Sequence, residues 1–134
     1  MPRSTIFHAV LLCLLLAGCT VNGTTSTAQI ASGYDLRSPT TTFVLPDMLH
    51  EVSGLTDIDA HTVACVQDEN GIIFFYDLEE QAIVRQLEFH LDGDYEGITR
   101  IGKMIYILRS DGTIYGVENY DDPNFILHTY TTGI

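Results

Sequence analysis

The sequence predicts an all-β fold, and three observations support this prediction. From Glu51 onward, short segments rich in Ile, Val, Tyr and Phe alternate with turn residues, as in sheets of antiparallel strands. No stretch after the first 18 residues shows a convincing 3.6-residue apolar period, which helices would need. The segments also recur at a spacing of about 42 residues. These features predict two similar units of about four strands each.

The expected strands can be placed in chain order from their composition and the turns that bound them. An inner strand is expected at the start of each unit, around residues 53–56 and 96–99. The remaining six follow from their content of β-branched and aromatic residues. They are Val63–Gln67, Ile72–Asp77, Ala82–Phe89, Met104–Leu108, Thr113–Val117 and Phe125–Tyr130.

Two motifs carry the repeat. Ser53-Gly54-Leu55-Thr56 recurs 43 positions later as Glu96-Gly97-Ile98-Thr99. Asn70-Gly71-Ile72-Ile73 recurs 41 positions later as Asp111-Gly112-Thr113-Ile114. Asn-Gly and Asp-Gly are the dipeptides that type I′ hairpin turns favour, so both units are expected to turn in this way. We expect one loop to hold the two-residue difference, because the loop after the first motif is longer than its counterpart.

A period of about 42 residues with four strands is typical of a β-propeller blade. The blades are expected at about residues 43–90 and 91–134. Eight strands in a sandwich fit less well, because a sandwich gives no reason for repeated glycine turns. Propellers close with four to eight blades, so two blades form an incomplete ring with both outer faces open. The chain is therefore expected to be an N-terminal fragment of a longer protein, or to associate with itself through these faces.

The first 18 residues have the form of a bacterial export signal. Arg3 precedes an apolar run of 13 residues, Ile6 to Gly18, which is interrupted by one histidine. The run is too short to span a hydrocarbon core and has the length of a signal-peptide h-region. It ends in Leu15-Leu16-Ala17-Gly18-Cys19, which has the pattern of a lipobox. Residues 1–18 are therefore predicted to be a lipoprotein signal peptide.

Cys19 is the predicted lipidation site, and its acyl chains would anchor the protein to a lipid bilayer. This places the protein in the cell envelope, on the extracytoplasmic side. Thr20, rather than Asp, follows the cysteine, which favours the outer membrane over the inner one in Gram-negative sorting. Residues 19–42 are rich in Thr, Ser, Gly and Asn and are predicted to be a flexible tether.

Composition limits the partners. The chain has 18 acidic residues against 6 Lys and Arg, which gives a net charge of −12, and all the acidic residues follow the predicted signal. Such a chain is not expected to bind nucleic acid or an anionic membrane surface through its charge. It can attract Ca²⁺, although acidity also serves solubility. Cys65 lies in an apolar run and is expected to be buried as a small hydrophobic residue.

The main candidate metal site is the acidic start of the second unit, Asp92-Gly93-Asp94-Tyr95-Glu96-Gly97. An EF-hand is excluded, because its twelfth position would be Lys103 and no helices flank the loop. In a propeller, however, the starts of the innermost strands face the central channel, where carboxylates can converge. Glu51 is equivalent to Asp94, so Glu51, Asp94 and Glu96 are the predicted Ca²⁺ ligands. The alternative is that they are solvated turn residues.

A second polar cluster lies at the predicted hairpin turns, in residues 67–71 and 108–112. The turns themselves need an Asn or Asp before glycine. Asp68, Glu69 and Arg109 are freer and are secondary ligand candidates. A carboxylate of one blade and the arginine of the next could form an inter-blade ion pair or contact a polar ligand.

Five ordered motifs together resemble the SdiA-regulated family, also called the YjiK family. They are Leu45-Pro46, Glu51-Val52-Ser53-Gly54-Leu55, Val66-Gln67-Asp68-Glu69, Gly93-Asp94-Tyr95-Glu96-Gly97-Ile98 and Leu108-Arg109-Ser110-Asp111-Gly112. The resemblance covers about residues 43–134. It implies an exported or membrane-anchored β-propeller, related in fold to phytase-like and NHL-repeat propellers. It also implies calcium-responsive behaviour, as in some members, but it supplies no defined reaction.

The sequence thus predicts a membrane-anchored, calcium-associated binding protein whose ligand is an unknown small molecule or protein. The alternative is a phytase-like, calcium-dependent phosphohydrolase, in which clustered ions hold a phosphate ester. That chemistry needs basic residues around the phosphate, and only Lys103 and Arg109 lie near the acidic positions. No catalytic residue is predicted, because the sequence has neither a G-x-S-x-G motif nor zinc-ligand spacing of its histidines. A truncated, non-functional chain is the third possibility.

Overall fold

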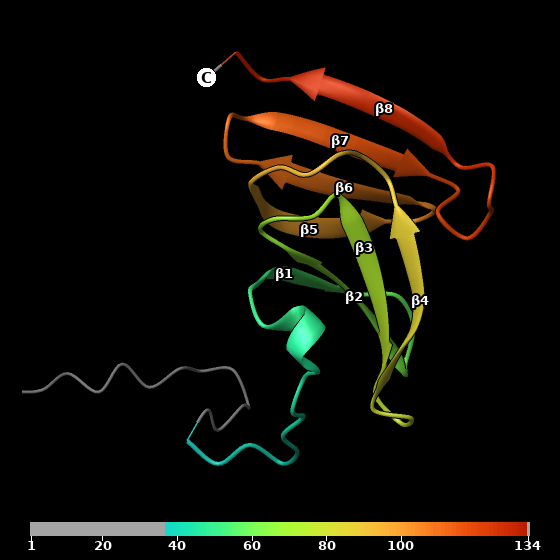
Figure 1. The fold of residues 1–134 in the computed structure, drawn as a ribbon. Coiled ribbons are helices and arrows are strands. Elements are labelled where there is room, and N and C mark those ends of the chain that lie inside the picture. Colours follow the sequence, from blue (N-terminus) through green and yellow to red (C-terminus); the bar gives the residue numbers. More distant parts are fainter. Residues whose placement is uncertain (1–36, 134) are drawn as a thin grey trace, which may run out of the picture. The chain divides into compact units, whose positions relative to one another are not determined.

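The computed structural model describes residues 37–133, in which the secondary structure begins at residue 47 (Figure 1). A short 3₁₀ helix, η2 (Asp47–Leu49), precedes eight strands. The strands are β1 (Val52–Asp57), β2 (Thr62–Gln67), β3 (Ile72–Asp77), β4 (Ala82–Glu88), β5 (Tyr95–Ile101), β6 (Met104–Arg109), β7 (Thr113–Glu118) and β8 (Ile126–Thr131). The fold is all-β, and each of the six strands predicted with bounds lies within one residue of its prediction.

The strands form two four-stranded sheets, each with its strands in chain order, β1-β2-β3-β4 and β5-β6-β7-β8. Every neighbouring pair is antiparallel. Each sheet is thus a simple meander, the arrangement of a propeller blade. We call them blade 1 (β1–β4) and blade 2 (β5–β8). The two blades pack together without closing a ring, as predicted.

The strand register confirms the repeat. Gly54 pairs with Val66 in blade 1, and Gly97 pairs with Leu108 in blade 2. In both blades a β-bulge immediately precedes this glycine, and it falls at Ser53 in one and at Glu96 in the other. Because the bulges coincide, the predicted equivalences of Ser53 with Glu96 and of Glu51 with Asp94 hold.

The two-residue difference between the units does not lie in one loop, contrary to the prediction. Asp57 pairs with Val63, whereas Arg100 pairs with Ile105, so the first hairpin of blade 1 is longer by one residue. The β2–β3 hairpin adds the second residue, as the pairings of Cys65 with Phe74 and of Ile107 with Tyr115 show. Both extra residues lie between the two repeated motifs, so the spacing of the motifs could not assign them to different hairpins.

The prediction of type I′ turns is also wrong. A type I′ turn needs positive φ at both central residues, and among Asn70, Gly71, Asp111 and Gly112 only Gly112 has a positive φ, of 80°. In blade 2 the Gly112 N–H donates to the carbonyl of Arg109 (2.9 Å), which makes a tight turn that ends in a left-handed glycine. At Gly71 the glycine serves a close approach instead, because an added Cβ would collide with the carbonyl of His90.

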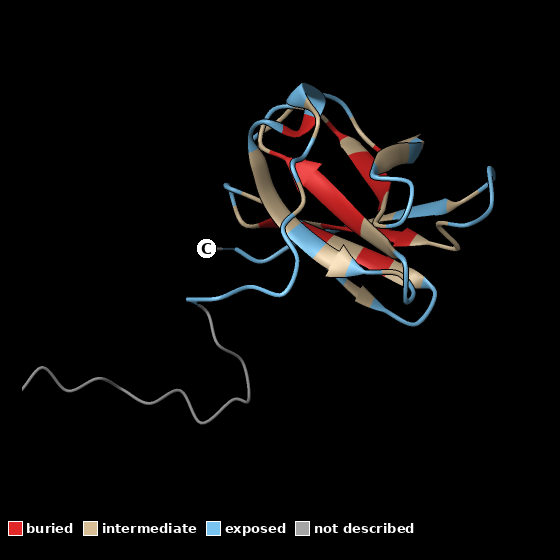
Figure 2. Ribbon diagram, turned by 90° about the horizontal axis from the view of Figure 1, so that it is seen from below, coloured by how far each residue is buried: buried red, intermediate tan, exposed pale blue. Residues whose placement is uncertain are grey.

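The main hydrophobic core lies between the two blades (Figure 2). We call the side of blade 1 that meets blade 2 the covered face, and the side of blade 2 that meets blade 1 the docked face. The covered face contributes Ala64, Val66, Ile73 and Phe75, and the docked face contributes Tyr95, Ile105, Ile107, Tyr115 and Val117. All nine residues are at least 98% buried. Burial of this apolar surface is the main force that holds the blades together.

A second, smaller core covers the other side of blade 1. Leu49 of η2 packs there on Cys65, Phe74 and Tyr76, which are also buried. The expectation that both outer blade faces are open is therefore wrong for blade 1, because the segment before β1 folds back over it. Cys65 is 1% exposed, as predicted, and desolvation raises the pKa of its thiol to about 11.

Candidate functional site

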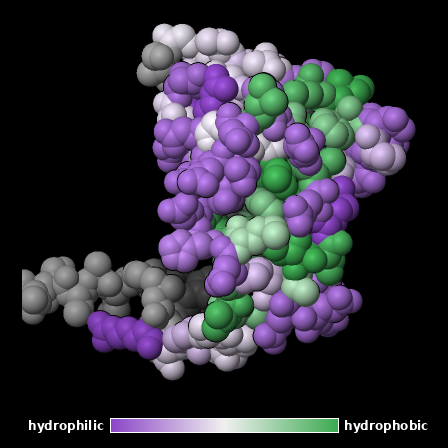
Figure 3. All heavy atoms as spheres, viewed as in Figure 1, coloured by the Kyte–Doolittle hydropathy of each residue, from purple (hydrophilic) through white to green (hydrophobic). Residues whose placement is uncertain are grey.

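The predicted ligands Glu51 and Asp94 lie at the same end of the two sheets, where β1 and β5 begin. Their main chains are held alike. The Asp68 N–H donates to the Glu51 carbonyl (3.3 Å), and the Ser110 N–H donates to the Asp94 carbonyl (2.8 Å). Both acidic residues are exposed. Figure 3 shows hydrophilic side chains gathered at this end, over the β6–β7 turn and the β4–β5 connection of Figure 1.

Asp68 lies between these two strand starts. Besides its bond to Glu51, its carbonyl accepts the N–H of Tyr95, the first residue of β5 (2.9 Å). Its carboxylate oxygen Oδ1 is buried and has no hydrogen-bond partner within residues 37–133. A buried, unpaired polar oxygen is costly, so native structures nearly always satisfy it. Asp68 was only a secondary candidate in the sequence, but in the structure it is the candidate whose carboxylate has a buried, unpaired oxygen.

Glu69 follows Asp68 and supports the connection between the blades. Its carbonyl accepts the N–H of Gly93 (2.9 Å), while the residue itself is exposed. Two N–H groups of the β2–β3 turn, those of Glu69 and Asn70, are satisfied by the side-chain oxygen of Gln67 at 3.1 and 2.7 Å. The side chain of Gln67 thus satisfies two main-chain donors of this turn at the polar end of blade 1.

Glu96, the third predicted ligand, occupies the bulge of β5 and is exposed. It lines an open cavity of about 360 Å³ with Arg109 and the β6–β7 turn. Within the described part of the chain, no group of three or more His, Cys, Asp or Glu residues is placed to hold a metal ion. The structure thus brings Glu51, Asp94 and Glu96 to one end of the sheets, but they form no metal centre by themselves.

Arg109 does not form the inter-blade pair that was considered for it. Its guanidinium makes two hydrogen bonds to the carboxylate of Asp111, two residues away in the same turn. These bonds, together with the N–H of Thr113, hold the pKa of Asp111 well below its usual range. The guanidinium also lies 5.5 Å from the ring centre of Tyr115. Arg109 therefore stabilises its own turn, and this pairing competes with any phosphate that would bind there.

The polar contacts between the blades come from other residues. Arg100 of blade 2 donates to the carbonyl and the carboxylate of Asp57 in blade 1, both at 2.8 Å, and this pairing lowers the pKa of Asp57. Arg85 of blade 1 donates to the carbonyl of Tyr120 (2.7 Å) and lies 3.5 Å from the ring centre of Phe75. A signal for the first pair was present, because Asp57 and Arg100 directly follow the repeated motifs and carry opposite charges.

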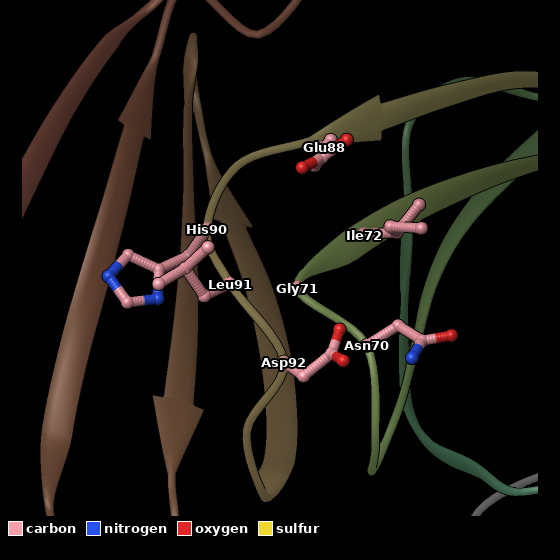
Figure 4. Close-up of a pocket in the computed structure, with 7 residues that line it drawn as sticks. All are labelled: Asn70, Gly71, Ile72, Glu88, His90, Leu91 and Asp92. Atoms are coloured by element: carbon pink, nitrogen blue, oxygen red, sulfur yellow. The ribbon is translucent and has the colours of Figure 1, made fainter.

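An open cavity of about 470 Å³ lies where the β2–β3 turn meets the β4–β5 connection (Figure 4). Asn70 and Asp92 lie on one side of Gly71, and Glu88 reaches over from the end of β4. The ring of His90 points away from them and lies against the ring of Tyr115 at a tilt of 39°, with 4.5 Å between ring centres. The cavity offers two carboxylates and an amide to a cationic or hydrogen-bond-donating ligand. Sequence reasoning did not identify it, because its residues meet only when the connection folds against the turn.

The signal peptide (residues 1–18), the lipidation site Cys19 and most of the predicted tether lie outside the described residues. Residues 37–46 belong to no helix or strand. Within residues 37–133, no helix has the length and apolar character needed to cross a membrane.

The sequence matches no protein-family model and no curated protein. Among solved structures, the chain is similar to BamB from Moraxella catarrhalis, with 15% identity and a TM-score of 0.44 over 60% of this chain and 24% of that one. It is also similar to Hsv2 from Kluyvelomyces marxianus, with 14% identity and a TM-score of 0.47 over 62% of this chain and 27% of that one. The chain thus spans about a quarter of the length of either structure.

Proposed function

We propose that the chain belongs to a lipid-anchored binding protein of the cell envelope, whose polar strand starts bind Ca²⁺ and, through it or beside it, a ligand. The observation that carries the proposal is the buried, unpaired Oδ1 of Asp68 between the starts of β1 and β5. A cation beside this oxygen would relieve the cost of burying it unpaired. Asp68 is hydrogen-bonded through its main chain to Glu51 and to Tyr95, the residue after Asp94, and Glu51 and Asp94 are both exposed.

Calcium suits this arrangement because it takes six to eight oxygen ligands in flexible geometry. Asp68 is the proposed central ligand, and the exposed side chains of Glu51, Asp94 and Glu96 would have to turn toward it to complete the site, because as placed they form no metal-binding group. The ion would draw its remaining oxygens from water, from its ligand or from a further polypeptide. Membership of the SdiA-regulated family is part of the same proposal and rests on the five sequence motifs.

Binding is favoured over phosphate-ester hydrolysis by the position of the basic residues. Arg109 is engaged by Asp111, and Arg100 is engaged by Asp57. A phosphohydrolase needs such groups free to neutralise the transferred phosphate. We therefore assign the acidic end of the sheets a binding role.

The calcium site is tested by calorimetric titration of the full chain with CaCl₂, with MgCl₂ as the comparison. The chain should bind Ca²⁺, and Asp68→Asn should weaken binding at least tenfold because it removes the charge beside the buried oxygen. Glu80→Gln, in the exposed β3–β4 turn, is the matched control and should leave the affinity unchanged. Absence of Ca²⁺ binding, or equal losses in both variants, would contradict the proposal.

The anchor is tested separately by producing the chain in a Gram-negative host that is fed a clickable palmitate. The wild type should carry the label and sediment with outer membranes, and Cys19→Ser should lose both properties. Cys65→Ser is the control, because Cys65 is buried in the folded protein. An unlabelled wild type would refute lipidation without touching the calcium proposal.

A further inference from the structure

The outer side of blade 2, which we call the open face, is largely apolar and uncovered within residues 37–133. It is formed by Tyr106, Leu108, Ile114 and Tyr130, with Ile101 at its edge. Gly116 lies beneath Tyr130 and Met104 and is buried, and the hydrogen-bonded pair Glu118 and His128 lies on the same side of the sheet. Leu108 is 42% exposed, Tyr130 46% and Ile101 68%. An apolar surface of this kind on a sheet usually marks an interaction site.

Each residue of the open face has an equivalent on the covered face of blade 1. The strand registers match Tyr106, Leu108, Ile114, Gly116 and Tyr130 with Ala64, Val66, Ile73, Phe75 and Leu87 in that order. In blade 1 these positions are buried against blade 2, or packed against that core in the case of Leu87. The open face of blade 2 therefore consists of the same positions with which blade 1 contacts blade 2.

The equivalent glycines Gly54 and Gly97 also indicate that a further strand could pack on β5 as β5 packs on β1. At Gly54 an added Cβ would lie 2.9 Å from Gly97 Cα, so the backbones of β1 and β5 are in direct contact there. At Gly97 an added Cβ would meet nothing within 4 Å. Gly97 thus presents to solvent the same bare backbone surface with which Gly54 receives the first strand of blade 2.

The chain after β8 also begins the route that leads from blade 1 to blade 2. After β4, the N–H groups of Phe89 and His90 donate to the carbonyl of Gly71, at 2.8 and 3.2 Å. After β8, the Thr132 hydroxyl donates to the carbonyl of Gly112, the equivalent of Gly71 (2.8 Å). A polypeptide that continued along this route would start a strand beside Gly97.

We propose that the open face of blade 2 docks a further four-stranded blade, head to tail, as the covered face of blade 1 docks blade 2. A second copy of the chain does not fit this role, because both of its docked-type faces are occupied. Leu49 covers the one on blade 1, and blade 1 covers the one on blade 2. The partner is thus a blade with a free apolar face. At the position equivalent to Arg100, this partner blade carries a neutral or acidic residue. In the docked arrangement that residue would face Arg100 of blade 2, just as Arg100 now faces Asp57 of blade 1.

The test supplies such a blade in tandem. Thr131 is equivalent to Glu88, so residues 132–134 correspond to 89–91 and a copy of residues 92–134 can follow Ile134 directly. The copy carries Arg100→Ser, which prevents two arginines from meeting. If the copy docks, the thermal transition of the full chain should rise by about 5 °C or more, since about 1 kcal/mol corresponds to several degrees in a domain of this size.

Leu108→Asp in the original blade 2 should abolish this rise, because it places a charge in the new interface. The same substitution in the appended copy is the matched control and should preserve the rise, because that face stays in water. Two results would overturn the proposal: a tandem chain whose copy unfolds separately at an unchanged parent transition, or a parent chain that sediments as a dimer which Leu108→Asp dissociates. The latter would make a second copy the occupant.

Discussion

Blades 1 and 2 share one pairing scheme and differ in what covers them. Blade 1 is enclosed, by η2 on one side and by blade 2 on the other, whereas residues 37–133 cover blade 2 on one side only. Equivalent residues therefore have unequal surroundings, as with Val66 at 0% exposure and Leu108 at 42%. The residues of each repeat thus determine how its strands pair. The contribution of a side chain to stability depends on whether a neighbouring element covers it.

The largest test of this comparison is Phe75→Ala. Phe75 is 2% exposed, stacks with Tyr120 at 6.1 Å between ring centres and lies under the Arg85 guanidinium. Its removal should lower the free energy of unfolding by about 3–5 kcal/mol, measured by urea denaturation. Tyr130→Ala, on the half-exposed open face, should cost less than about 1.5 kcal/mol. Similar losses in the two variants would show that the blades are not enclosed differently.

A second comparison uses equivalent aliphatic positions. Val66→Ala should cost about 2 kcal/mol, because it removes two buried methyl groups and leaves a cavity. Leu108→Ala removes more carbon but should cost less, about 1 kcal/mol or below, because Leu108 is already partly in water. Urea unfolding of both variants decides the order, and a larger loss for Leu108→Ala would contradict the assignment of the faces.

The glycines sharpen the comparison at the backbone. Gly54→Ala should lower stability by about 1–3 kcal/mol, since its Cβ would press on the main chain of β5. Gly97→Ala should be neutral or raise stability by up to about 1 kcal/mol, because its Cβ has space and alanine restricts the unfolded chain. Equal effects in thermal unfolding would mean that β1 and β5 do not approach each other as described.

A further test concerns the dependence of stability on pH. The pKa of the buried Cys65 thiol is raised from 9.0 to about 11, so the protonated thiol contributes stability in full below pH 9. Between about pH 9 and 11 the unfolded chain loses this proton before the folded chain does, and stability falls. Cys65→Val should show a smaller decline over that range, followed by urea unfolding at each pH. Parallel declines would place the thiol in contact with water.

Most of the fold could be predicted from the sequence, because strand composition and two repeated motifs report on local pairing. The motifs at residues 53–56 and 96–99 gave the correct equivalence of the inner strands, and the structure adds a β-bulge at the same place in each, which the sequence did not predict. Turn type was not predictable from Asn70-Gly71, because that glycine serves the approach of His90 rather than a positive φ. The packing of Leu49 on blade 1 was not predictable either. It depends on the path of the segment before β1, which has no equivalent in the second repeat.

The candidate site was predictable only in outline. Glu51 and Asp94 were correctly placed as equivalent residues at strand starts, but sequence spacing carries no information on which oxygens are buried. Asp68 therefore ranked below them until its unpaired oxygen was seen. An inter-blade ion pair was one of two roles considered for Arg109, yet Asp111 lies two residues away and pairs with it locally. Short-range partners of this kind generally form first, because they cost little chain entropy.

The opposite charges of Asp57 and Arg100 at the same place in the repeat bear on how neighbouring copies avoid exchanging parts during folding. If blade 1 of one molecule docked on blade 1 of another, two aspartates would meet where an ion pair now forms. If blade 2 met blade 2, two arginines would meet. The opposite charges thus favour docking of blade 2 on blade 1 over contacts between two like blades, although the two blades have nearly the same architecture.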